Sequence, residues 1–254
     1  MATFLVAHGA WSAGWSWKKM RPLLHERGHI MYTPTYTGVG ERVHLAGPEI
    51  GLGTHIEDIL AVLRFEDLKG VYLIGHSYGG MVVTAVADRA PRLLAHLIYL
   101  DAFVPRHGQS LFDLHPAEVR SGLREAAQKF GDGWRVPPNP LPPDTSEEDT
   151  AWITPRRVPQ PLKTFEEPVF LSGRGSPVPT SYVYCTRPAP GDIFLPFARR
   201  ARHEPGWRYF EIDASHSPHI TAPEALASLL DKITKGGSTR SHGPDQEILD
   251  PGHG

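Results

Sequence analysis

The pentapeptide Gly75-His76-Ser77-Tyr78-Gly79 fits the pattern G-x-S-x-G, in which a serine stands on a sharp turn between a strand and a helix. An apolar, β-rich run at residues 71–74 precedes it, and a helical run at 81–89 follows it. The flanking glycines permit the turn, because a Cβ there would clash. The pattern predicts a Ser77 hydroxyl at a helix N-terminus, where backbone N–H groups favour developing negative charge. This is the setting of a nucleophile; a glycine-rich turn with an exposed serine is the alternative interpretation.

Three more residues with suitable chemistry come just after predicted strands. They are His8, Asp101 and His216. Because the carboxyl ends of parallel strands meet at one edge of a sheet, we expect these side chains to lie near Ser77. A serine hydroxyl becomes a good nucleophile when a base takes its proton, and His216 suits that role. His219 shares the loop with His216, but two histidines without nearby cysteine or carboxylate ligands make a poor metal site, so no metal is expected.

Short apolar runs alternate with amphipathic helical patterns along most of the chain. Thr54 and Glu57 form a capping-box pattern, which predicts that the second helix begins near Thr54. Strict alternation favours an open, mainly parallel sheet of about six strands with helices on both faces. The strands are predicted at residues 3–7, 30–33, 71–74, 94–100, 180–185 and 207–212, and the main helices at 15–27, 54–68, 81–89, 117–130, 195–202 and 223–233.

The alternation stops between residues 103 and 178. Apart from a helix at 117–130, this region holds a proline-rich and acidic stretch at 136–150 that is predicted to lack regular structure. We therefore expect a core of residues 1–104 and 179–234 and a proline-rich cap, or lid, insertion at 105–178. Residues 235–254 are rich in Gly, Ser and His without periodicity, which predicts a disordered tail.

Composition excludes several classes of protein. A formal net charge of -2 over 254 residues gives no reason to expect nucleic acid or an anionic membrane as a partner. No stretch approaches the roughly 18 apolar residues of a membrane span, and the first residues lack the basic segment of a signal peptide. Cys185 is the only cysteine, so no intrachain disulfide can form. A reducing compartment and a cytoplasmic location are predicted.

Several motifs in order carry a resemblance to a known family. They are His8-Gly9-Ala10-Trp11, the turn that carries Ser77 at 75–80, the YLDAFVP segment at 99–105, Tyr-Cys-Thr at 184–186 and the loop at 213–218. Together they resemble the α/β-hydrolase superfamily, and within it the small branch of plant methylesterases, hydroxynitrile lyases and related bacterial esterases. The resemblance covers residues 3–233. It implies an α/β-hydrolase fold with no cofactor.

The resemblance also implies roles for individual residues. Ser77 matches the nucleophile, His216 the base, and the backbone N–H groups of Ala10 and Tyr78 the donors to the oxyanion. His8 and Trp11 are expected to line the substrate pocket, although Trp11 is equally compatible with a packing role.

The acid of the triad departs from the family pattern. The branch usually carries an aspartate three residues after the cysteine of the Tyr-Cys-Thr motif, and here that position is Pro188. Two carboxylates could replace it: Asp101, fixed at the end of a strong strand, and Asp192, in a loop. We favour Asp101, because the sheet determines where it points.

These residues predict a serine hydrolase that cleaves a carboxylic ester, thioester or lactone of a small organic molecule through an acyl-Ser77 intermediate. A ligand-binding or cyclase-type protein on the same fold is the alternative. A hydroxynitrile lyase is less favoured, since that group typically has threonine where Ala10 stands and lysine where Ser217 stands.

Overall fold

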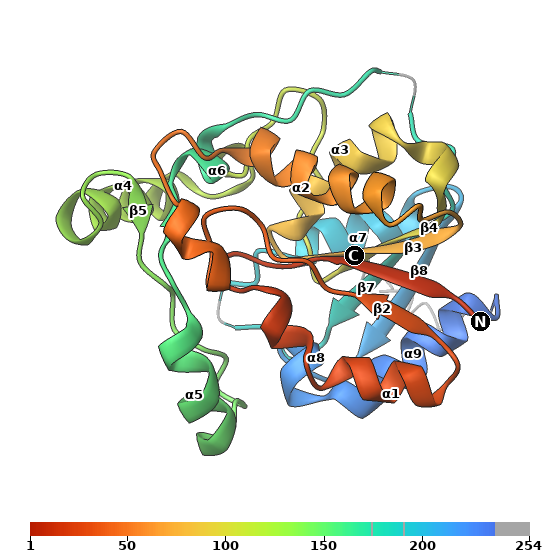
Figure 1. The fold of residues 1–254 in the computed structure, drawn as a ribbon. Helices are drawn as coiled ribbons and strands as arrows, with labels where there is room; N and C mark the ends of the chain where they lie inside the picture. The colour runs from red at the N-terminus through yellow and green to blue at the C-terminus, as the bar shows by residue number, and fades with distance from the viewer. Residues whose placement is uncertain (174, 190, 237–254) are drawn as a thin grey trace, which may run out of the picture.

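A six-stranded parallel sheet forms the centre of the structure (Figure 1). The computed structural model describes residues 1–236 apart from 174 and 190. Within them the strand order is β2-β1-β3-β4-β7-β8, and every pair is parallel. The predicted open sheet of about six strands is confirmed. The strands are β1 (Thr3–Ala7), β2 (Ile30–Tyr32), β3 (Val71–His76), β4 (Leu94–Leu100), β7 (Thr180–Cys185) and β8 (Trp207–Ile212).

Helices cover both faces of the sheet, as predicted. Successive residues of β1 point into different apolar clusters: Leu5 packs in one cluster with residues of α2 (Leu52–Phe65), α3 (Gly79–Arg89) and α7 (Leu195–His203). Phe4 packs in the other with residues of α1 (Met20–Glu26) and α9 (Pro223–Thr234). Figure 1 shows α2 and α3 above the sheet and α1, α9 and the short α8 (Pro218–Thr221) below it. Three short 3-10 turns belong to this core: η1 (Gly14–Trp17), η2 (Gly40–Leu45) and η3 (Pro91–Leu93).

Two predicted helix starts are wrong. The helix expected at 15–27 is divided into η1 and α1, and Pro22 lies in the first turn of α1, where a missing N–H is tolerated. α2 begins at Leu52, two residues before the predicted capping box, with Gly51 in an extended conformation before it. The side chain of Glu167 accepts a hydrogen bond from the Gly53 N–H at 3.1 Å. A carboxylate from far along the chain thus occupies the N-terminus of this helix.

Between β4 and β7 the chain leaves the sheet, and Figure 1 shows α4 (Ala117–Phe130), β5 (Arg135–Val136) and α5 (Glu147–Ile153) of this insertion at one side of the core. The predicted helix at 117–130 is confirmed as α4. The prediction that residues 136–150 lack regular structure is wrong at both ends, where β5 and α5 lie. The Ser146 side chain accepts the Asp149 N–H at 3.1 Å and so caps α5. The insertion contains η4 (Phe112–Leu114), α4 (Ala117–Phe130), β5 (Arg135–Val136), α5 (Glu147–Ile153), η5 (Thr154–Arg156), β6 (Gln160–Pro161) and α6 (Lys163–Glu166).

The predicted disordered tail, residues 235–254, lies outside the described residues from 237 onward. Among the helices of the described part, none is long and apolar enough to cross a membrane.

The strand order creates a crevice at the carboxyl edge of the sheet. The chain runs from β1 outward to β2 and then returns to β3 on the other side of β1. The loops after β1 and β3 therefore diverge, and ligands of open α/β sheets bind at such a point. His8 directly follows β1, and Ser77 directly follows β3.

The N-terminus of α3 packs against main-chain carbonyl groups with no space for a side chain. A Cβ on Gly79 would lie 2.0 Å from the carbonyl oxygen of Ala7, and one on Gly80 would lie 2.0 Å from that of Phe103. Glycine is required at both positions because the helix approaches the ends of β1 and β4 this closely. That approach places the Ser77 turn between the two strand ends.

We expect Gly80→Ala to lower the free energy of unfolding by about 3 kcal/mol, because the added methyl group must displace the main chain at Phe103. Gly122→Ala in α4 is the matched control: Gly122 is exposed, and a Cβ there meets nothing within 4 Å. It should raise the free energy of unfolding by up to about 1 kcal/mol through helix propensity. Urea denaturation of both variants measures the contrast, and equal effects would contradict the packing argument.

Candidate active site

Ser77 has a left-handed backbone conformation, with φ 54°. Its N–H donates to the carbonyl of Leu100 at 3.3 Å, and its own carbonyl accepts the N–H groups of Gly80 (3.0 Å) and Phe103 (3.2 Å). These main-chain bonds hold a conformation that a residue with a Cβ adopts at some energetic cost. The turn has the geometry expected of a nucleophile elbow, and Ser77 lines a cavity.

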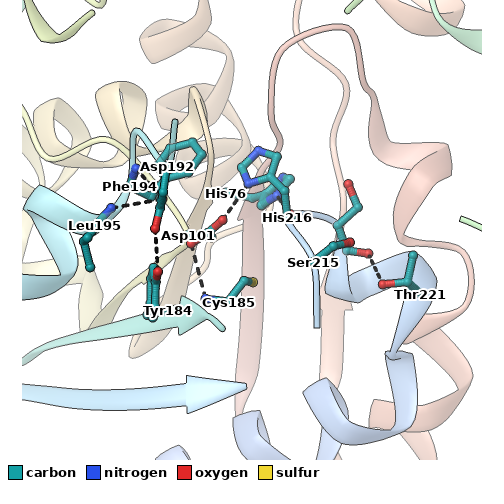
Figure 2. A network of polar contacts seen from close by, with 12 residues as sticks. His76, Asp101, Tyr184, Cys185, Asp192, Phe194, Leu195, Ser215, His216 and Thr221 are labelled. Carbon is teal, nitrogen blue, oxygen red and sulfur yellow. Dashed lines mark hydrogen bonds and ion pairs between the residues drawn. The ribbon is translucent and has the colours of Figure 1, made fainter. Parts of the chain in front are cut away.

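The structure brings Asp101 and His216 together (Figure 2). The His216 Nδ1 lies 2.7 Å from Asp101 Oδ2. The other oxygen, Oδ1, accepts the Cys185 N–H at 3.3 Å, so both carboxylate oxygens have a donor. Asp101 is buried, and its φ of 42° aims the side chain back across the strand ends. With Nδ1 engaged by the carboxylate, Nε2 is the nitrogen that remains for another partner.

Asp192, the alternative acid, makes hydrogen bonds to residues other than His216 (Figure 2). One of its oxygens accepts the N–H groups of Phe194 (3.0 Å) and Leu195 (3.1 Å) at the start of α7. The other accepts the Tyr184 hydroxyl at 2.5 Å. Asp192 lines the cavity, but its carboxylate serves the N-terminus of α7 rather than the ring of His216.

His216 is fixed by its neighbours as well as by Asp101. Its ring stacks on Phe194, with centroids 4.6 Å apart and planes 10° apart. Its carbonyl accepts the Nε2–H of His76 at 2.7 Å. The preceding residue, Ser215, is buried and donates its hydroxyl to Asp144 at 2.5 Å. A residue of the insertion thereby holds the loop that carries His216.

The loop after β1 lies directly against Ser77. A Cβ on Gly9 would lie 3.1 Å from the Ser77 Cβ. The next residue, Ala10, and Tyr78, after Ser77, both line the cavity. Within the described residues, neither backbone N–H donates to a protein acceptor. Two unpaired amides beside one serine can stabilise a negatively charged oxygen.

His8 and Trp11 were both expected to line the pocket, and of these two only Trp11 does so. His8 is 1% exposed and lies outside the cavity lining, which corrects that expectation. Its Nδ1–H donates to Gly9 (2.8 Å), while Nε2 accepts the Tyr36 N–H (3.2 Å). Both ring nitrogens are used to shape the loop after β1.

Trp11 lines the cavity and also joins the core to the insertion. Its indole Nε1–H donates to the carbonyl of Val136 at 2.9 Å, and its backbone N–H donates to the Gln160 side chain at 3.2 Å. The ring packs edge-on against Phe165. The two interpretations of Trp11, pocket wall and packing aromatic, therefore both apply.

The cavity above Ser77 has a volume of about 510 Å³. One wall comes from strand-end loops of the core and the other from the insertion. The insertion side is apolar and rich in proline. Its lining includes Leu111, Val119, Leu123, Pro140, Leu141, Pro142, Pro143, Ile153 and Phe165. Such a surface suits a small organic molecule. In the described part of the chain, no cluster of three or more His, Cys, Asp or Glu side chains is arranged to bind a metal ion.

A family model described as "Alpha/beta hydrolase family" matches residues 4–229. The chain belongs to the alpha/beta hydrolase family. This confirms the family and fold that the motifs predicted.

Known proteins similar to this hydrolase include two enzymes and one solved structure. A carbendazim-hydrolysing esterase of Nocardioides sp. (strain SG-4G) is 38% identical over 91% of this chain and 98% of its own. A pyrethroid hydrolase of Sphingobium wenxiniae is 26% identical over 95% of this chain and 94% of its own. An extracellular α/β-hydrolase structure from a Paenibacillus species is 28% identical, with a TM-score of 0.79 over 91% of this chain and 98% of that one. These relatives support the prediction of a serine ester hydrolase.

Three residues that bind the insertion of this hydrolase to its core were not predicted. Asp144, Gln160 and Glu167 all lie in the insertion and bind core residues distant in sequence. No local pattern marks them, because each acts through a single hydrogen-bonding group whose partner is brought near only by the fold.

Buried histidines lie in and beside the site. Burial lowers the pKa of His8, His55 and His219 to about 3 and holds the pKa of His76 well below its usual value. His55 accepts the Tyr78 hydroxyl at Nδ1 (2.9 Å) and donates from Nε2 to a carbonyl. These rings are neutral in the folded protein at neutral pH.

Buried neutral histidines make stability depend on pH. Each binds a proton in the unfolded chain below about pH 6.5 but stays neutral when folded until about pH 3, so stability is lost as pH falls through this window. Between pH 8 and pH 5 we expect a loss of about 2 kcal/mol for each such histidine. Carboxylates remain largely ionised at pH 5. Urea denaturation at the two pH values measures the loss.

His55→Gln should be less stable at pH 8 yet show a smaller loss on acidification, because one proton-binding difference is removed. His25→Gln is the control for the substitution itself: the side chain is exposed, so the free energy of unfolding at pH 8 should stay close to the parent's. Equal free energies of unfolding at pH 8 and pH 5 in the parent protein would contradict the inference that these buried histidines stay neutral in the folded protein.

Proposed function

We propose that the protein hydrolyses carboxylic esters of small, largely apolar organic molecules through an acyl-Ser77 intermediate. The observation that carries this proposal is the His216–Asp101 contact of 2.7 Å in the cavity that Ser77 also lines. Similarity to a carbendazim-hydrolysing esterase and to a pyrethroid hydrolase supports it.

In the proposed reaction, the Ser77 hydroxyl attacks the ester carbonyl while Nε2 of His216 takes its proton. Asp101 holds the ring in the tautomer that leaves Nε2 unprotonated and stabilises the imidazolium that forms. The ring then gives the proton to the departing alcohol. Water, activated by the same nitrogen, cleaves the acyl-enzyme and releases the acid.

The tetrahedral intermediates carry a negative oxygen between the N–H groups of Ala10 and Tyr78. Each such donor contributes about 3 kcal/mol to the stability of the transition state in comparable sites. Both donors follow closely packed glycines. A Cβ on Gly79 would lie 2.0 Å from the Ala7 carbonyl oxygen, and one on Gly9 would lie 3.0 Å from the His76 ring and 3.1 Å from the Ser77 Cβ. Little reorganisation is therefore needed during the reaction.

Residues 105–178 act as the cap of this enzyme in our proposal. They supply the apolar wall of the cavity and hence its substrate preference. Carbendazim and a pyrethroid ester belong in a first substrate screen, beside aryl esters, thioesters and lactones of graded acyl length. We keep the prediction of a cytoplasmic location, which fluorescence imaging of the tagged protein in its host would test.

A lyase on the same scaffold is disfavoured by Ala10 and by Ser217, where the hydroxynitrile lyases of the branch typically have threonine and lysine. A protein that binds ligands without turnover would not have a reactive Ser77 hydroxyl. Covalent labelling of Ser77 therefore distinguishes such a protein from an esterase.

A fluorophosphonate should label the protein once per chain, at Ser77, and Ser77→Ala should remove both labelling and nearly all hydrolysis. Ser12→Ala is the matched control. Ser12 also lines the cavity, but its hydroxyl donates to Ser16 at 2.8 Å and lies beside no base, so labelling should persist. Intact-protein mass spectrometry counts the adducts. Hydrolysis by Ser77→Ala within tenfold of the parent would refute the proposal.

Asp101→Asn should lower kcat about a hundredfold or more, because the imidazolium loses its carboxylate. Asp192→Asn removes a charge from the same cavity without touching His216, so kcat should stay within about tenfold of the parent. Steady-state kinetics on one aryl ester measures which of the two substitutions lowers kcat more. The reverse ranking would move the acid to Asp192.

A further inference from the structure

Two arginines line the cavity, and they differ in their partners. Arg187 binds Asp213 through two parallel hydrogen bonds, from Nε at 2.7 Å and from Nη2 at 2.6 Å. Its charge is therefore balanced by a carboxylate.

Arg157 has no such partner. Its Nη1 donates to the Asn139 carbonyl and its Nη2 to the Asn139 side-chain oxygen, each at 2.5 Å, and both acceptors are neutral. No carboxylate lies within ion-pair distance of it among the residues that the structure describes. A guanidinium has five N–H donors, so three remain for another molecule.

Arg157 is half-buried, and burial lowers its pKa to about 10. It is still charged at neutral pH. A partly buried charge without a counter-ion costs free energy that a bound anion would recover.

The other charges of the cavity do not balance Arg157. The carboxylates of Asp101 and Asp192 also line it, but both oxygens of each already accept hydrogen bonds from their own neighbours. Both belong to the core side, after β4 and before α7, whereas Arg157 comes from the insertion. The insertion wall thus presents one cation without a carboxylate partner in a lining that is mostly apolar and otherwise uncharged.

We propose that Arg157 binds a carboxylate on the substrate, separate from the ester that is cleaved. This inference rests on the proposed function, because it defines the substrate class of the same site: esters that are apolar in the middle and carry an anion at one end. A guanidinium fork pairs with a carboxylate in a planar, two-bond arrangement, which an apolar surface around it strengthens.

A structural role for Arg157 is the competing explanation, since its bonds to Asn139 hold the proline-rich segment. The two explanations differ in what a substitution changes. Loss of a structural brace would affect every substrate alike. Loss of an anion site would affect only substrates that carry the anion.

The test uses pairs of esters that differ only in the remote charge. On the acyl side, 4-nitrophenyl hemiesters of succinate, adipate and suberate are compared with the same compounds methylated at the free carboxylate. On the alcohol side, carboxyphenyl acetates are compared with their methyl esters. The parent should show higher kcat/KM for the anionic member in one of these series.

Arg157→Gln should lower kcat/KM for that anionic member about tenfold or more, as expected for the loss of a charge-assisted hydrogen bond, and change the neutral member less than twofold. Arg157→Lys should keep part of the preference, since it keeps the charge but not the fork. Arg156→Gln is the matched control: this neighbour is exposed, donates to the Trp152 carbonyl and lies outside the cavity lining. It should leave both members unchanged.

Binding to Ser77→Ala separates this inference from the proposed function. Calorimetry with monomethyl and dimethyl adipate, succinate and suberate should show tighter binding of the anionic member, lost in Ser77→Ala/Arg157→Gln. This readout holds even if Ser77 is not the nucleophile. No anionic preference in either kinetics or binding, or equal losses for charged and neutral members in Arg157→Gln, would overturn the inference.

Discussion

The site depends on the close approach of α3 to the ends of β1 and β4. At Gly79 and Gly80 this helix touches the carbonyl groups of Ala7 and Phe103 so closely that no Cβ fits. The approach places Ser77, in its left-handed conformation, between the two strand ends, and both Tyr78 and Ala10 line the same cavity. One packing constraint therefore positions both the nucleophile and the donors that the proposed chemistry needs.

The position of His216 has a different origin, because its loop has little structure of its own. Asp101 engages one ring nitrogen, Phe194 stacks on the ring, and His76 binds the backbone carbonyl. These contacts come from β4, the start of α7 and β3. The proposed role of His216 as a base needs a fixed ring with one nitrogen left for Ser77, and these contacts fix the ring through Nδ1, its face and its backbone carbonyl.

Features that depend on local sequence could be predicted, and those that depend on distant partners could not. The six strands and the Ser77 turn follow from apolar runs and glycines within a few residues. The start of α2 could not be predicted, because its N-terminus binds Glu167 of the insertion rather than the local capping box. His8 was also misplaced, because one of its two partners, the Tyr36 N–H, is distant in sequence. Its position after β1 suggested a pocket residue, but Tyr36 and Gly9 occupy both nitrogens.

Among the described residues, no strand of the insertion joins the six-stranded sheet; shared apolar packing and polar contacts bind the insertion to the core. Val136 and Gln160 bind Trp11, Asp144 binds Ser215, and Asp149 pairs with Lys19 at 2.6 Å. These contacts reach loops of the core that line the cavity or lie near it. The insertion therefore both completes the cavity and fixes the loops that carry Trp11 and His216. Arg157 lies between two of these contacts in the chain, on the insertion wall of the cavity, whereas Ser77 and His216 lie at the edge of the sheet. Substrate preference can therefore vary on this wall while the chemistry of the sheet edge stays the same.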